Sequence, residues 1–128
     1  MTPVLREWVT KAEGDFHSCE REIRARRRPN HDSACFHAQQ CVEKYLKARL
    51  QAANIVFPKT HDLEELLDLL LPLEPQWELL RPAVAQLTNY AVAFRYPGTT
   101  ASKADARNAF AHAKLVRQIA RQSLGLKK

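Results

Sequence analysis

The helical spacing of apolar residues between positions 34 and 52 constrains the fold of this chain more than any other feature. Small or aromatic apolar residues recur there at alternating steps of four and three, namely Ala34, Ala38, Cys41, Tyr45, Ala48 and Ala52. This period places all of them on one face of an α-helix. A strand would instead show apolar residues at every second position, and no segment of useful length does so. The segment is therefore predicted to be a helix that packs against others.

The chain before this segment predicts a long first helix. Apolar residues keep a helical period from Pro3, a residue suited to the first turn of a helix, up to the basic cluster Arg24–Arg28. Cations at that point lie at the negative end of the helix macrodipole. The cluster is therefore interpreted as a charged helix terminus, with a nucleic-acid-binding patch as the alternative. Asn30 or Asp32 then caps the second helix, which ends near Ala53.

Three more helices are predicted downstream. Asp62 begins a third helix that turns its leucines inward and carries acidic residues outward. Apolar residues in the segment 77–94 repeat at steps of three and four, and Pro82 either kinks this helix or marks its true start. Ser102 or Asp105 opens a final helix. The predicted fold is an all-α, antiparallel up-and-down bundle of about five helices.

Length and composition fit this fold and exclude several classes of protein. A chain of 128 residues is expected to be a single domain, residues 1–128, and only three glycines argue against a loop-rich or all-β structure. The N-terminus shows no basic start followed by an apolar run, and nowhere do about eighteen apolar residues run together. We therefore expect a cytoplasmic protein with no membrane association.

The cysteines and histidines give no sign of a metal site or a cofactor. Cys19, Cys35 and Cys41 lie at apolar helical positions rather than in a Cys-x-x-Cys pair, and are interpreted as small core residues. There is no His-Glu-x-x-His motif, calcium loop, glycine-rich phosphate loop or Gly-x-Ser-x-Gly elbow. Neither a metal nor another cofactor is expected.

The second helix also carries a polar face that simple solvation does not explain. Opposite the apolar stripe lie Gln40, Glu43, Lys44, Lys47 and Gln51. A merely solvated face would be satisfied by almost any polar residues. The formal net charge of the chain is +6, which favours acidic partners such as nucleotides, RNA or an acidic protein surface.

Three blocks of residues together resemble a known family. The segment 36–48 reads Phe-His-Ala-Gln-Gln-Cys-Val-Glu-Lys-Tyr-Leu-Lys-Ala, the segment 60–63 reads Thr-His-Asp-Leu, and the segment 95–97 reads Arg-Tyr-Pro. These blocks, in this order over nearly the whole chain, resemble the HEPN domain, the higher eukaryote and prokaryote nucleotide-binding helical domain. The resemblance implies an antiparallel helical bundle, frequent homodimerisation, and pairing with a separately encoded minimal nucleotidyltransferase in a toxin–antitoxin module.

The first functional hypothesis is a binding module. Lys44, Lys47, His61 and Arg95 form a site for a nucleotide or RNA phosphate, and the helical faces bind the nucleotidyltransferase partner. Lysine and arginine supply charge-assisted contacts without needing a reacting histidine. His37 joins this site or is a satisfied interfacial histidine, and His61 binds the ligand or anchors the start of the third helix.

A metal-independent ribonuclease toxin is the alternative. The resemblance implies that many HEPN domains cleave RNA with an Arg-x4-6-His motif, in which histidine performs acid/base work and arginine stabilises charge. After Arg95 the histidine is missing, because its positions are Thr100, Ala101 and Ser102. The spacing recurs in the pairs Arg24–His31, Arg26–His31 and Arg107–His112, of which about one or two are expected by chance.

No catalytic residue is assigned, and Arg95, Arg107 and His112 are kept as candidates. Along one helix, five residues separate side chains by about 140°, so Arg107 and His112 would not converge within one protomer. The resemblance also implies that some partners attach AMP to a tyrosine near the motif, which makes Tyr96 a candidate for modification.

A third interpretation of the function is a dimeric helical scaffold without a ligand.

Overall fold

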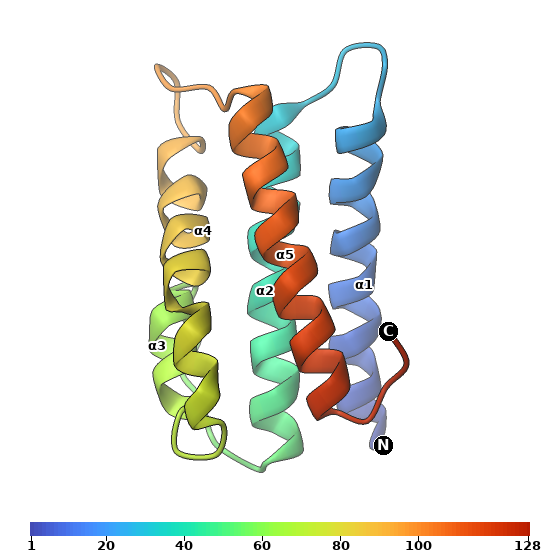
Figure 1. The fold of residues 1–128 in the computed structure, drawn as a ribbon, viewed down its shortest axis with the longest axis vertical. Coiled ribbons are helices and arrows are strands. Elements are labelled where there is room, and N and C mark those ends of the chain that lie inside the picture. The colour runs from blue at the N-terminus through green and yellow to red at the C-terminus, as the bar shows by residue number, and fades with distance from the viewer.

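Five α-helices and one 3₁₀ helix make up the computed structural model, which describes residues 1–128 (Figure 1). The elements are α1 (Pro3–Arg24), α2 (His31–Ala52), α3 (Leu63–Leu70), η1 (Pro75–Leu80), α4 (Arg81–Ala93) and α5 (Lys103–Ser123). There is no β-strand. The prediction of an all-α bundle is therefore confirmed.

Local caps place the helix boundaries close to their predicted positions. Asn30, rather than Asp32, caps α2, because its side-chain oxygen accepts a hydrogen bond from the backbone N–H of Ser33 at 2.9 Å. At the start of α5, Ser102 accepts from the backbone N–H of Asp105, whose carboxylate accepts from the backbone N–H of Ser102. This reciprocal capping box stabilises the first turn of α5.

Residues 77–94 do not form one helix. The chain first makes the 3₁₀ helix η1, and α4 then begins at Arg81 with Pro82 in its first turn. Proline fits the first turn of a helix because the backbone N–H that it lacks would have no partner there. Of the two predicted alternatives, Pro82 therefore marks a helix start rather than a kink.

The helices α1, α2, α4 and α5 alternate in direction, and α3 lies beside α4 (Figure 1). Residues 53–62 run back along α2, because His61 contacts Glu43 in the middle of that helix. The short helix α3 then runs antiparallel to α4. Its first backbone N–H, from Leu63, bonds to Thr88 within α4, while its later residue Asp68 pairs with Arg81 at the start of α4.

The central helix is α2, which packs against α1, α3, α4 and α5. Its predicted apolar stripe is buried at every position except the last, since Ala52 is exposed at the helix end. No helix is long and apolar enough to pass through a lipid bilayer.

All three cysteines are buried in the core and form no disulfide. Burial raises the pKa of Cys19 to about 12 and that of Cys35 to about 12, with smaller contributions from neighbouring groups. Burial also raises the pKa of Cys41 well above its ordinary value. The thiols are therefore protonated at neutral pH and act as small packing groups.

Candidate functional site

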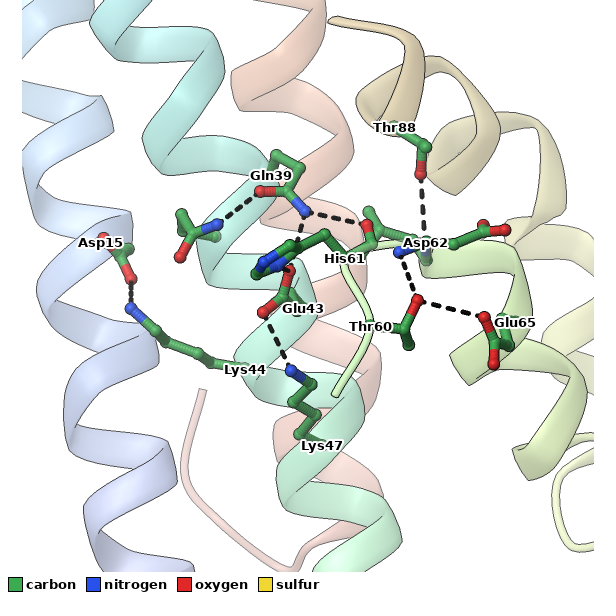
Figure 2. Close-up of polar contacts among 12 residues, drawn as sticks. Asp15, Gln39, Glu43, Lys44, Lys47, Thr60, His61, Asp62, Glu65 and Thr88 are labelled. Atoms are coloured by element: carbon green, nitrogen blue, oxygen red, sulfur yellow. Dashed lines mark hydrogen bonds and ion pairs between the residues drawn. The ribbon is translucent and has the colours of Figure 1, made fainter. Parts of the chain in front are cut away.

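Glu43 is the centre of a buried polar network on α2 (Figure 2). Its carboxylate accepts hydrogen bonds from Gln39 Nε2 at 3.1 Å and Lys47 Nζ at 3.1 Å, and from His61 Nδ1 at 2.9 Å. Glu43 is only 4% exposed and Lys47 only 7%. Burial alone would raise the pKa of Glu43, but the hydrogen bonds from His61, Gln39 and Lys47 outweigh it and lower this pKa. The ionised carboxylate therefore compensates the buried charge of Lys47.

Helical spacing and the returning chain assemble this network. Gln39, Glu43 and Lys47 are four residues apart on α2, so their side chains lie in one row. His61 arrives from the segment before α3, and its backbone carbonyl also accepts from Gln39 Nε2 at 3.4 Å. The ammonium of Lys47 lies 5.8 Å from the ring centroid of Trp8, within cation–π range. The spacing within α2 thus brings Gln39, Glu43 and Lys47 together, and tertiary packing adds His61 and Trp8.

A second network joins α2 to α1 through Asp15. One oxygen of this carboxylate accepts from His37 Nδ1 at 2.8 Å, and the other accepts from Lys44 Nζ. Asp15 is buried, and Lys44 and His37 are partly buried beside it. Sequence reasoning missed Asp15 because no motif contains it. Its one signal is an acidic residue within the apolar face of α1, directly before Phe16.

Arg95 has no hydrogen bond or ion pair with either network, and its pocket lies far along α2 from Lys47 of the Glu43 network. Its side chain is exposed and lines a pocket of about 160 Å³ with Asp32, Phe36, Tyr90, Ala91 and Phe94. On α2, Phe36 precedes Lys47 by eleven residues, which is about 16 Å along the helix axis. The five predicted phosphate ligands therefore divide between two carboxylate-paired networks and one arginine at the end of the bundle.

The loop that carries Arg95 and Tyr96 is tied to the start of α2. The Asp32 carboxylate accepts a hydrogen bond from the backbone N–H of Ala101 at 2.7 Å. Asp32 was predicted as an alternative cap of α2, and it holds this loop instead. Tyr96 is 64% exposed, so its phenol is accessible from solvent.

Arg107 and His112 both lie in α5 and face different neighbours. His112 Nε2 bonds to the side-chain oxygen of Gln86 in α4, and burial lowers the pKa of His112. Arg107 is exposed and lines a pocket separate from that of Arg95. Arg26 and His31 line the same pocket as Arg107. A ribonuclease site that joins Arg107 to His112 would therefore need a second protomer.

These features define the class of protein as a helical-bundle domain with charged networks along its central helix. No three His, Cys, Asp or Glu side chains are placed to hold a metal ion. The model of the HEPN domain family matches residues 5–123, nearly the whole chain, and the chain belongs to this family. Searches of curated proteins and of solved structures found no match. Membership of the HEPN family indicates a function that involves nucleotide or RNA, through binding or cleavage.

Proposed function

We propose that this HEPN domain binds the phosphate groups of a nucleotide or RNA and pairs with a nucleotidyltransferase in a toxin–antitoxin-like module. The observation that carries the proposal is the exposed Arg95 beside an aromatic pocket. An arginine guanidinium forms two parallel hydrogen bonds to a phosphate. Phe36 is 45% exposed at the same pocket and offers a ring face on which a base can stack.

The two carboxylate networks have a supporting part in this proposal. His61 keeps 72% of its side chain exposed, while Glu43 and Lys47 lie buried behind it. His61 is therefore the member of its network that an incoming phosphate reaches first. Lys44 and His37 are partly exposed in the same way beside Asp15. A phosphate at these positions competes with a carboxylate, whereas Arg95 forms no ion pair. Asp32, the one carboxylate in the lining of its pocket, accepts a hydrogen bond from the backbone N–H of Ala101.

Isothermal titration calorimetry with ATP and with a short single-stranded RNA tests the binding. We expect micromolar binding of at least one of the two ligands. Arg95→Ala should weaken it roughly tenfold, because a hydrogen bond to a charged group contributes on the order of 1.5 kcal/mol. Lys114→Ala removes an exposed cation from the middle of α5 and should change little. Absence of both ATP and RNA binding at micromolar concentrations would contradict the proposal.

The partner and the homodimer are tested separately. Phe36, Val92 and Tyr96 are large exposed apolar or aromatic residues that a protein partner or a second copy can cover. A nucleotidyltransferase encoded by the neighbouring gene should copurify with the chain, and light scattering should show a dimer.

Mass spectrometry after coexpression tests AMP attachment to Tyr96, and Tyr96→Phe is the matched control. Failure to copurify removes the partner from the proposal, and an unmodified Tyr96 removes the modification.

A further inference from the structure

A second basic pocket lies at the end of the bundle, between the turn that joins α1 to α2 and the first turn of α5. Figure 1 shows this turn and the start of α5 at the same end of the molecule. The pocket has a volume of about 340 Å³. It is lined by Ile23, Ala25, Arg26, Pro29, His31, Lys103, Ala106 and Arg107.

The polar side chains of this pocket are all basic. Arg26, Lys103 and Arg107 are exposed, His31 is half-buried, and no aspartate or glutamate lines the pocket. None of the ion pairs in the chain involves these four residues. This separates the pocket from the networks of Asp15 and Glu43, where every cation already has a carboxylate partner.

Two helix termini add to the positive potential. His31 is the first residue of α2 and Lys103 is the first residue of α5. The N-terminus of a helix carries a partial positive charge that favours an anion, and each first turn here also holds one carboxylate, Asp32 in α2 and Asp105 in α5. Arg27 and Arg28 are exposed on the adjoining turn and extend the basic surface beyond the pocket.

The lining also indicates the chemistry of the ligand. No phenylalanine, tyrosine or tryptophan lines the pocket, so it offers no aromatic ring of these kinds for stacking a base. Three cations and a histidine, continued by the arginines of the turn, present more positive charge than one phosphate needs. Such a surface fits a chain of phosphates and contacts it without regard to base sequence.

The pocket and the Arg95 site meet at the start of α2. His31 lines the basic pocket, and the next residue, Asp32, lines the pocket of Arg95. A strand of RNA that crosses the end of the bundle can therefore contact both sites.

We propose that this pocket, formed by Arg26, His31, Lys103 and Arg107, binds the phosphodiester backbone of single-stranded RNA. The inference rests on the proposed function, which it deepens by naming RNA as the ligand and by adding a second contact surface. Arg95 and its aromatic pocket hold one nucleotide, and the basic pocket holds the phosphates that follow in the strand. The set contains one of the Arg–His pairs found in the sequence, Arg26–His31, and joins it to Lys103 and Arg107 of α5, which no sequence motif connects to that pair.

Fluorescence anisotropy with a labelled poly-uridine RNA tests the inference over a series of salt concentrations. The double variant Arg26→Ala/Arg107→Ala removes two lining cations, and Arg6→Ala/Lys114→Ala removes two exposed cations elsewhere. We expect the first variant to weaken RNA binding at least about tenfold, and to reduce the slope of log K against log salt by about 1.4, or 0.7 for each lost phosphate contact. The second variant should retain the slope of the wild type. A thermal melt establishes that both variants are folded.

Two negative results are distinguishable. If the wild type binds RNA and Arg26→Ala/Arg107→Ala binds it with the same affinity and salt slope, the basic pocket is not the RNA site and the proposed function stands. If the wild type binds ATP through Arg95 but binds no RNA, the basic pocket is likewise not an RNA site, and the proposed function again stands. If the wild type binds neither ATP nor RNA, the proposed function fails together with this inference.

Discussion

At the scale of single residues, Glu43 accepts more side-chain hydrogen bonds than any other residue of the central helix. It accepts from three donors that come from α2 and from the segment before α3. Removing its charge leaves the buried ammonium of Lys47 without a compensating partner, and an uncompensated buried charge is strongly destabilising. The family motif around Glu43 therefore stabilises the bundle. This role does not depend on whether a ligand binds to the exposed side chain of His61.

Glu43→Gln should lower the free energy of unfolding by roughly 2 kcal/mol at neutral pH. The folded-state pKa of Glu43 lies below its ordinary value of 4.5. Its stabilising contribution is therefore complete above that pH and is lost as the pH falls through the folded-state pKa. Urea unfolding should show a stability difference between wild type and variant that is smaller at a pH well below 4.5 than at neutral pH. The exposed Glu7→Gln serves as the control, and an equal gap at both pH values would contradict this role.

The cysteines give a second prediction at the residue scale. Cys19, Cys35 and Cys41 are buried and their pKa values are raised, so the reactive thiolate is scarce and inaccessible. Ellman's reagent should react with none of them in the native protein and with all of them in urea. An added surface cysteine, Ala111→Cys, should react at once in the native state. Rapid native labelling of the wild type would show that the core opens.

At the scale of helices, boundaries were predictable because caps and breaking residues act locally. Asn30, Asp62 and Ser102 accept backbone hydrogen bonds from residues two or three positions later, so a short window of sequence contains the whole interaction. The period of apolar residues likewise identified the packed face of α2. The HEPN motif blocks could be recognised for a related reason, since they are short and keep their order along the chain.

The surroundings of the polar face could not be predicted in this way. Glu43 and Lys47 resemble surface residues in the sequence, yet they are buried, because α2 has neighbours on several sides. The pairing of Lys44 with Asp15 joins residues 29 positions apart, and the basic pocket unites α5 with a turn far upstream. Periodicity within one helix carries no information about which side chains another helix brings to it.

The capping box of α5 gives a prediction at this scale. Ser102→Ala removes the oxygen that accepts from the N–H of Asp105 and should destabilise the protein by about 1 kcal/mol, the usual effect of losing such a cap. Thr99→Ala, in the exposed loop just before, should change stability little. Urea unfolding of both variants measures the difference. Equal stability of the two variants would show that the box does not stabilise α5.

At the scale of the whole molecule, the positive charge that gives the chain its net charge of +6 is unevenly distributed. Carboxylates pair several cations along the middle of the bundle, as Asp15 does for Lys44 and Glu43 for Lys47. Unpaired arginines gather at the end where α1 joins α2 and where α4 joins α5, and Figure 1 shows both connections at this same end. We expect this asymmetry to direct a polyanion to one end of the molecule.

The most direct test of RNA binding at this end is a titration of the ¹⁵N-labelled protein with single-stranded RNA, followed by heteronuclear NMR. Because RNA is expected to contact the α1–α2 turn, the Arg95 loop and the first turn of α5, the amide signals of residues 26–32, 94–96 and 103–107 should shift in proportion to added RNA. Signals from η1 at the opposite end should stay in place. RNA binding at the basic end is contradicted if no amide signal shifts at millimolar RNA, or if the shifts cluster around η1 and leave the basic end unchanged.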